Sequence, residues 1–409
     1  RCQRQLLRPD CRQQDCRQLV FLRGHPDQPL RRRRPLKMEL IARRLGVEVL
    51  KPPLKLIEHG AWQVDRTAQL FDQLRLATRI EQHFIDIRDF DAVYGLLAQS
   101  SPEIVIHLAA QALVRRSYSE PLETFHTNVS GGINLLEAVR LAPTVRSLVF
   151  ITSDKCYRNM EWQRGYHEDD ILGGPDPYSA SKGAIELVFT GYQDSFFRAR
   201  PDLVAATTRA GNVIGGGDMS TDRIVPDCIR ALRAGEPVVL RNPGATRPWQ
   251  HVLEPLSGYL TLALYQADGD EAAAGAWNFG PDNENVRPVQ ELAETAVTVW
   301  GSGEVRIERD PDAPHEATLL MLDSGKAKNE LGWRPRWDFA TGVTRAVEWY
   351  KGLDDGLNMN DELTVVAERD DGSTVEFPVT AQVGTPAAVR YVKNDGILHL
   401  VLRRLLTEE

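Results

Sequence analysis

The run Ile-Val-Ile-His-Leu at residues 104–108 decides the fold class, because it is apolar without alternation. A strand buried on both faces has this pattern, which is typical of parallel sheets covered by helices on both sides. Two further runs of this kind occur at 147–152 and 203–208. Helical patterns separate them at 120–140 and 179–200. This alternation predicts an α/β fold with a doubly wound parallel sheet.

The segments before this run are less regular. They predict a loop at 51–68, a helix at 69–83, a strand at 84–87 and a helix at 91–98. In a doubly wound sheet, ligands bind beyond the carboxyl ends of the strands. The polar residues that directly follow each strand are therefore the candidates for a functional site.

The chain is expected to have four parts. Residues 1–37 form a basic, atypical N-terminus, and residues 38–210 form the sheet domain. Residues 211–352 are rich in Gly, Pro, Trp and Asn and predict a smaller C-terminal substrate domain. Residues 353–409 predict an appended tail, with a β-hairpin over 362–379 and a short basic helix at its end.

Composition sets broad limits on function. The 409 residues are 42% apolar and 26% charged, which is typical of a globular protein of two or three domains. The net charge of -8 argues against general nucleic-acid binding. Residues 1–45 nevertheless carry thirteen Lys and Arg against four Asp and Glu. Such a run occurs in anion-binding arms and in solvated termini, and the composition favours the second.

The cysteines do not form a metal-binding pattern, and we expect no metal. They show no C-x-x-C pair and are few for the length, which fits a reducing cytoplasm better than a disulfide scaffold. The start of the chain has no pattern of a secretory signal, and no apolar run is long enough to span a membrane. The five cysteines of the chain are Cys2, Cys11, Cys16, Cys156 and Cys228.

Tyr178 and Lys182 are the strongest catalytic candidates. They lie four positions apart in a predicted helix, so their side chains share one face. An ammonium beside a phenol favours the phenolate, which can act as a base toward a substrate hydroxyl. Ser153 ends the preceding buried strand and could hydrogen-bond the same hydroxyl. This spacing is also common on ordinary helix surfaces, so the assignment depends on the surrounding segments.

Strand-end Ser followed by Tyr-x-x-x-Lys resembles the triad of the short-chain dehydrogenase/reductase superfamily. His-Leu-Ala-Ala-Gln at 107–111, Asp-Ile-Arg-Asp at 86–89, the Gly-rich stretch at 209–218 and Arg-Pro-Trp-Gln-His-Val at 247–252 are similar to segments of its extended members. The resemblance implies a Rossmann-like fold and NAD as the cofactor. It implies NAD contacts by Asp86, Ile87, Leu108, Ala109, Ala110, Gln111, Asn128, Tyr178 and Lys182. It implies substrate contacts by Arg115, Asn212, Arg223, Arg241, Arg247 and His251.

Thr-Ser-Asp-Lys-Cys-Tyr at 152–157 points to one reaction within that superfamily. An Asp followed by Lys after the strand-end Ser is similar to the CDP-glucose 4,6-dehydratase family, as are the stretches at 110–117 and 209–218. The resemblance covers about residues 69–350. It implies a catalytic set of Ser153, Asp154, Lys155, Tyr178 and Lys182.

The implied activity is an internal redox cycle on a nucleotide sugar. Tyr178 would take the proton of the sugar 4-hydroxyl, Lys155 would remove the C5 proton, and Asp154 would protonate the departing 6-hydroxyl. The products would serve deoxysugar synthesis for O-antigen and other bacterial surface polysaccharides. The implied partner is a small nucleotide sugar, with neither nucleic acid nor membrane, in a cytoplasmic homo-oligomer, either dimer or tetramer.

Two segments depart from that pattern. The superfamily begins with a strand and a Gly-rich turn for the NAD pyrophosphate, yet residues 19–36 keep only Gly24 of it and contain four consecutive Arg. Residues 361–406 resemble the C-terminal end of aconitase-type hydratases. Three alternatives to CDP-glucose dehydration therefore stay open: another sugar-nucleotide 4,6-dehydratase, an epimerase, or a catalytically impaired remnant that binds nucleotide sugar without NAD.

Overall fold

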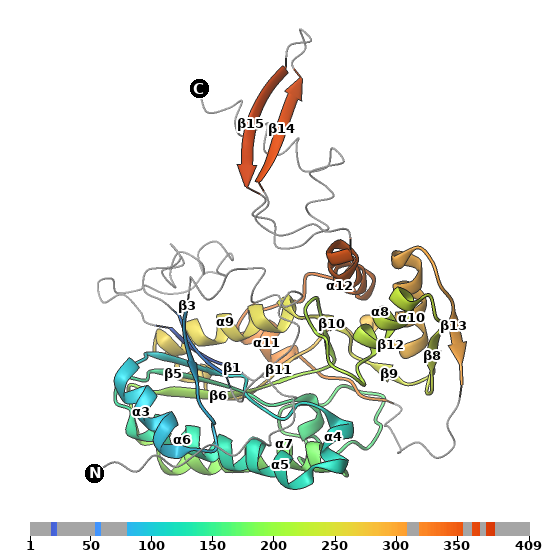
Figure 1. The fold of residues 1–409 in the computed structure, drawn as a ribbon. Coiled ribbons are helices and arrows are strands. Elements are labelled where there is room, and N and C mark those ends of the chain that lie inside the picture. The colour runs from blue at the N-terminus through green and yellow to red at the C-terminus, as the bar shows by residue number, and fades with distance from the viewer. Residues whose placement is uncertain are drawn as a thin grey trace, which may run out of the picture.

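The computed structural model describes residues 18–22, 54–58, 80–308, 319–354, 362–368 and 374–380. Gly24, the Arg run at 31–34, the three N-terminal cysteines and the helix expected at the end of the tail lie outside these residues. A seven-stranded sheet forms the centre of the described part (Figure 1). Its strands, in spatial order, are β11 (Gly275–Phe279), β6 (Val204–Ala210), β5 (Ser147–Ile151), β4 (Ile104–His107), β1 (Gln18–Leu22), β2 (Leu54–Glu58) and β3 (Ile80–Phe84).

The sheet confirms the predicted α/β class, with one exception in strand direction. β11, β6, β5 and β4 pair in parallel, and so do β2 and β3. β1 runs antiparallel to both of its neighbours, β2 and β4. Leu19 is opposite His107 and Leu22 is opposite Ile104, so the chain leaves β1 at the edge where β4 begins.

Three predictions at this side of the sheet are wrong. Residues 51–68 contain β2 rather than only loop, and residues 80–83, expected to end a helix, belong to β3. The strand expected at 84–87 ends at Phe84. The reason is a turn at Asp86, whose carboxylate accepts the Arg88 N–H at 2.8 Å and whose carbonyl accepts the Asp89 N–H at 3.0 Å. Asp commonly starts turns in this way.

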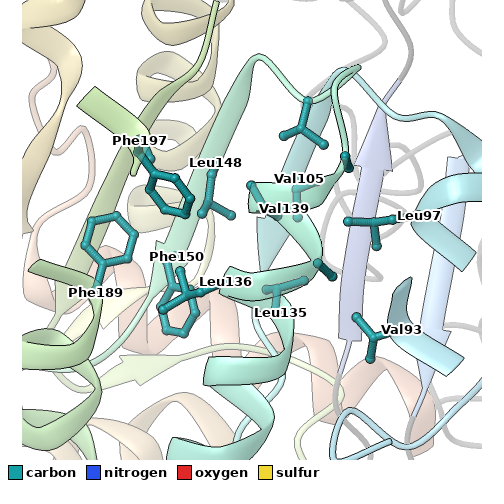
Figure 2. Packing of buried hydrophobic residues seen from close by; sticks show 14 of the residues in the cluster. Val93, Leu97, Val105, Leu135, Leu136, Val139, Leu148, Phe150, Phe189 and Phe197 are labelled. Atoms are coloured by element: carbon teal, nitrogen blue, oxygen red, sulfur yellow. The ribbon is translucent and has the colours of Figure 1, made fainter. Parts of the chain in front are cut away.

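One face of the sheet is covered by three helices, shown in Figure 2. Val105, Leu148 and Phe150 project from the strands into this layer and pack against apolar residues of the helices. Apolar residues on both faces of consecutive strands follow from the unbroken runs in the sequence. The helices are α3 (Phe90–Ser100), α6 (Gly131–Leu141) and α7 (Pro177–Ser195). Two shorter helices precede α6: α4 (Val114–Ser119) and α5 (Pro121–Phe125).

The opposite face is covered by elements that come later in the chain. Ile104, Ile106 and Val149 pack here against α9 (Leu253–Ala267) and the residues around α11 (Gly325–Glu330). β11 and α9 lie beyond residue 210, so the chain returns to the sheet after leaving it. The predicted boundary between the two domains at residue 210 stays a prediction. β11 and α9 follow that boundary in the sequence and nevertheless belong to the sheet and its covering layer.

A second cluster of buried side chains forms a separate lobe. It lies to one side of the sheet in Figure 1 and contains three helices and several short strands. The helices are α8 (Ile224–Ala234), α10 (Val289–Trp300) and α12 (Phe339–Asp354). The strands pair as β7 (Val213–Ile214) with β10 (Gln250–His251), β9 (Thr246–Arg247) with β12 (Arg287–Pro288), and β8 (Val238–Leu240) with β13 (Val305–Ile307).

The predicted hairpin of the tail is confirmed. β14 (Glu362–Glu368) pairs antiparallel with β15 (Thr374–Thr380), and the two form a sheet of their own. Among the residues that the structure describes, no helix has the length and apolar character needed to cross a bilayer.

Candidate active site

A single 3₁₀ turn after β5 presents Ser153, Asp154 and Lys155. Ser153 caps this turn: its Oγ accepts the Lys155 N–H at 3.2 Å and donates to Asp154 Oδ1 at 2.9 Å. Ser is well suited to this position because its short hydroxyl can bond the backbone of the first turn. Neighbouring side chains on an extended strand would point apart, whereas the turn brings Asp154 and Lys155 together.

Asp154 and Lys155 form an ion pair with unequal exposure. Lys155 Nζ lies 3.4 Å from Asp154 Oδ1; the Asp154 side chain is 1% exposed and that of Lys155 is 28% exposed. Within the described residues, Asp154 Oδ2 is buried and has no hydrogen-bond partner. A buried carboxylate oxygen without a protein partner is costly, so it is suited to a group that a ligand brings.

Tyr178 and Lys182 lie on the first turns of α7, as predicted. Asp176 caps this helix by accepting the Ser179 N–H at 2.9 Å, and Pro177 occupies its first position. Both predicted side chains are buried, and Lys182 Nζ lies 5.9 Å from the centre of the Tyr178 ring. The shared helix face is thereby confirmed.

His107, at the end of β4, is electrostatically coupled to Lys182. Burial, and secondarily the positive charge of Lys182, lowers the pKa of His107 to about 3. Its ring packs on Phe150 with the ring centres 4.4 Å apart. The imidazole is therefore neutral at physiological pH and places no second positive charge beside Lys182.

The loop after β4 is held in place by Asn128. Its Nδ2 donates to the Gln111 carbonyl at 3.0 Å and to Ser181 Oγ at 2.9 Å, and its Oδ1 accepts the Gln111 N–H at 2.5 Å. Asn128 belongs to a π-helical turn, His126–Ser130, of the kind often found at functional sites. Leu108, Ala109 and Ala110 thus lie on a backbone fixed between β4 and α7.

Asp86 and Ile87 lie at the same edge of the sheet, beyond β3. The Arg88 guanidinium pairs with Asp86 at 2.7 Å and with Glu123 at 2.5 Å. The Ile87 carbonyl accepts a hydrogen bond from Asn134 at 3.0 Å. The predicted cofactor residues therefore follow the carboxyl ends of β3 and β4 or lie on the π-helical turn and α7, and β1 and β2 separate the two strand ends in the sheet.

Sequence reasoning missed a buried ion pair that contacts both ends of the 152–157 segment. Glu186 on α7 pairs with Arg209 on β6 at 2.8 Å, and both side chains are almost fully buried. Glu186 also accepts hydrogen bonds from Thr152, the residue before Ser153, and from Thr207 at 2.8 Å. The sequence does place Glu186 four residues beyond Lys182 on the same helix face, but it gives no sign that Arg209 is its partner.

Arg209 of this pair also contacts the other end of the segment, at Tyr157. Arg209 donates to the Tyr157 hydroxyl at 2.7 Å, and that hydroxyl donates to Asn278 Oδ1 on β11 at 2.9 Å. The 152–157 segment is therefore held at both ends, at Thr152 by Glu186 and at Tyr157 by Arg209.

Three of the predicted substrate residues are arginines with acidic neighbours. Arg115 on α4 and Arg241 after β8 both pair with Asp222, at 3.6 Å and 3.7 Å. Arg223, at the start of α8, pairs with Asp218 at 3.2 Å. The structure thus brings Arg115 of the sheet domain together with Arg241 of the second lobe.

The remaining predicted substrate residues are placed differently. Asn212 has a buried Oδ1 without a partner in the described part of the chain, and Arg247 lies on β9. The His251 ring is buried edge-on against Trp337, with 4.7 Å between ring centres. Burial, and then the charge of Arg345, lowers its pKa to about 4. Its contact with substrate stays a prediction.

The described residues at the carboxyl edge fit NAD in part. The loop at 108–111, Asp86, Tyr178 and Lys182 are the residues expected to contact NAD, and these contacts stay a prediction. The carboxyl end of β1 lies at the opposite edge of the sheet, because β1 runs antiparallel to β4. No group of three or more His, Cys, Asp or Glu that could hold a metal occurs in the described ranges.

Comparison with known proteins identifies the family. A model of the GDP-mannose 4,6 dehydratase family matches residues 57–346. CDP-glucose 4,6-dehydratase from Salmonella typhimurium is 46% identical over 310 residues, which are 74% of this chain and 86% of that protein. dTDP-glucose 4,6-dehydratase from Streptomyces antibioticus is 30% identical over 65% of this chain and 75% of that protein.

Solved structures have the same fold. A crystal structure of the dTDP-glucose 4,6-dehydratase DesIV from Streptomyces venezuelae, with NAD bound, has a TM-score of 0.59 and 26% identity, and the match covers 68% of this chain and 83% of that one. UDP-glucose 4-epimerase from Thermus thermophilus in complex with NAD also has a TM-score of 0.59, at 24% identity, over 70% of this chain and 97% of that one. The family match ends before the tail, so the aconitase-like resemblance of 361–406 stays a prediction. The chain belongs to the GDP-mannose 4,6 dehydratase family of enzymes.

Proposed function

We propose that this chain dehydrates CDP-glucose to CDP-4-dehydro-6-deoxyglucose, with NAD as a cofactor that is regenerated in each cycle. The observation that carries this proposal is the Asp154–Lys155 pair on the turn that adjoins α7. An epimerase expels no water and has no use for an additional acid and base beside Tyr178. CDP as the nucleotide rests on the 46% identity to the Salmonella enzyme.

Each protein group has a definite proton to move. Tyr178 takes the proton of the 4-hydroxyl, with Lys182 stabilising the phenolate that accepts it. When bound, NAD would accept the hydride that leaves C4 and later return it to C6. The 4-keto group acidifies the C5 proton, which Lys155 can take only as a neutral amine.

The Asp154–Lys155 contact offers a way to make that amine. Transfer of one proton from Lys155 Nζ to Asp154 across 3.4 Å gives a neutral base and a neutral acid together. Lys155 then removes the C5 proton while Asp154 protonates the 6-oxygen, the C6–O bond breaks, and water leaves. Lys155 returns its proton to C5 when C6 is reduced. The Asp154–Lys155 pair then regains from solvent the proton that left with the water, and Tyr178 releases the 4-hydroxyl proton to solvent. Ser153 orients Asp154 through their 2.9 Å hydrogen bond.

A second candidate function is supported by the direction of β1. β1 runs antiparallel to β2 and β4, so its carboxyl end lies at the edge of the sheet opposite the one beyond which Asp86 lies, whereas a phosphate-binding turn is expected beside the other cofactor residues. The chain would then bind nucleotide sugar while holding NAD weakly or not at all. The cytoplasmic location and a dimeric or tetrameric assembly, which the sequence resemblance implies, belong to the main proposal as expectations.

The deciding experiment separates cofactor from substrate. The purified chain is denatured, and any released dinucleotide is identified by mass; NAD and CDP are then titrated separately by calorimetry. The dehydratase proposal predicts NAD in the released fraction and binding of both ligands. Binding of CDP without NAD supports the second candidate, and a chain with residues 19–36 replaced by a Gly-rich turn should then regain NAD binding. Failure to bind CDP contradicts both.

A further inference from the structure

Two of the arginines expected to contact the substrate, Arg115 and Arg241, share one carboxylate of the protein. Asp222 Oδ1 lies 3.6 Å from Arg115 and 3.7 Å from Arg241. The side chains are partly exposed, at 33% for Arg115 and 44% for both Asp222 and Arg241, so a ligand from solution can reach them. One acidic side chain therefore lies where two guanidinium groups converge.

The spacing of these two guanidinium groups suits a diphosphate better than a single carboxylate. Both separations exceed the length of a charge-assisted hydrogen bond, which is about 2.7–2.9 Å. Guanidinium groups bind phosphate oxygens through two parallel N–H donors, and a diphosphate presents several such oxygens. Asp222 satisfies the charge of the two arginines without using their geometry fully.

The loop that carries Asp222 is firmly held. Arg230 donates to the carbonyls of Met219 at 3.3 Å and Ser220 at 3.1 Å, and Tyr350 donates to the Asp218 carbonyl at 2.6 Å. Asp218 Oδ1 accepts the Ser220 N–H at 3.0 Å. The position of Asp222 thus follows from a braced loop.

Asp222 also has an unusual backbone conformation. Its φ is +59°, in the left-handed region that residues other than Gly rarely adopt, although Asp and Asn tolerate it best. Such conformations are maintained where the surroundings impose them and concentrate at ligand clamps and switch segments.

We propose that Asp222 is an internal competitor for the substrate diphosphate, an inference that rests on the proposed function. In the free protein it pairs with Arg115 and Arg241; a diphosphate displaces it and takes both guanidinium groups. A ligand with less negative charge displaces it poorly. Asp222 thereby raises selectivity for nucleoside diphosphates over monophosphates and nucleosides, at the expense of absolute affinity.

The test uses Asp222→Asn in the full chain, because Asn keeps the size and the tolerance of positive φ. Calorimetry at low salt measures the binding of CDP, CMP and cytidine. The variant should bind CDP about three- to tenfold more tightly, from the loss of two partly exposed ion pairs. The affinity for CMP should increase by a larger factor than that for CDP, so that the preference for CDP over CMP narrows, while the affinity for cytidine should not change. Asp202→Asn, an exposed ion-pair partner of Arg200, controls for the loss of one negative charge.

Every outcome decides the inference. Equal or weaker CDP binding by Asp222→Asn overturns the inference. That result would show that Asp222 orients the arginines for the ligand and does not compete with it. The same gain in Asp202→Asn overturns it too, because net charge would then be the cause. If the unmodified chain and both variants all fail to bind CDP, the proposed function fails and the inference fails with it.

Discussion

Glu186 and Arg209 form an ion pair 2.8 Å long in the interior of the protein, between α7 and β6. Glu186 also accepts a hydrogen bond from the Thr152 hydroxyl, and Arg209 donates one to the Tyr157 hydroxyl. This pair therefore holds both ends of the 152–157 segment. Burial acts to raise the pKa of Glu186, but the charge and hydrogen bonds of Arg209 outweigh it and hold that pKa below 4.5. Both groups are therefore charged at neutral pH.

Arg209→Met should strongly destabilise the protein. It leaves the Glu186 carboxylate buried without its cation, which typically costs about 3–5 kcal/mol in the free energy of unfolding. Urea unfolding followed by Trp fluorescence measures this. Arg198→Met, which removes a 70% exposed arginine paired with Asp194, is the control and should cost about 0.5 kcal/mol. The double variant Glu186→Leu/Arg209→Met should be more stable than Arg209→Met, and a lower stability would contradict the charge argument.

The free energy of unfolding should fall with pH below neutrality because of two buried histidines. The pKa of His107 is lowered to about 3 and that of His251 to about 4, against an ordinary 6.5. Between pH 6.5 and 4 the unfolded chain binds protons at these sites and the folded chain does not. Each site then removes about 1.4 kcal/mol per pH unit as the pH falls. Unfolding midpoints at several pH values measure this slope, and His251→Phe should reduce it; an unchanged slope would exclude His251.

Tyr178→Phe should abolish hydride abstraction and leave CDP binding nearly intact. Only the hydroxyl is lost, and it acts in the transition state. Loss of a general base lowers the rate about 10²–10⁴-fold. Reduced nicotinamide absorbance in a single turnover reports the step, and calorimetry with CDP reports binding. Full turnover by this variant would remove Tyr178 from the proposed mechanism.

Asp154→Asn should allow oxidation at C4 but slow the loss of water. The amide keeps the shape of the side chain but cannot donate an acid proton to the 6-oxygen. Reduced cofactor should therefore accumulate in a single turnover, whereas the unmodified enzyme shows little. Formation of the 4-keto-6-deoxy product at the normal rate, without this accumulation, would rule out Asp154 as the acid.

Removal of residues 355–409 should leave the body folded. β14 and β15 pair only with each other among the described strands, and the family match ends at residue 346. The thermal midpoint and CDP binding should be unchanged. Removal of residues 339–409 is the comparison: it also deletes α12, whose Val343, Ala346 and Val347 lie in the buried cluster of the second lobe. This longer deletion should unfold that lobe. If removal of residues 355–409 lowers the thermal midpoint as much as the longer deletion does, the tail is part of the folded body.

The sequence alone was sufficient where structure depends on local periodicity. Unbroken apolar runs predicted β4, β5 and β6, because a strand covered on both faces has no polar side. The four-residue spacing of Tyr178 and Lys182 predicted their shared face, since neighbouring turns of a helix bring such side chains together.

Only the tertiary structure decided which distant groups meet. No local pattern indicates that Glu186 pairs with Arg209, that Asp222 lies between Arg115 and Arg241, or that β1 runs against its neighbours. A strand has the same side-chain alternation in either direction, so its sequence does not specify whether it pairs in parallel. A charged side chain selects its partner from whatever the fold brings within about 4 Å, and that choice depends on the path of the whole chain.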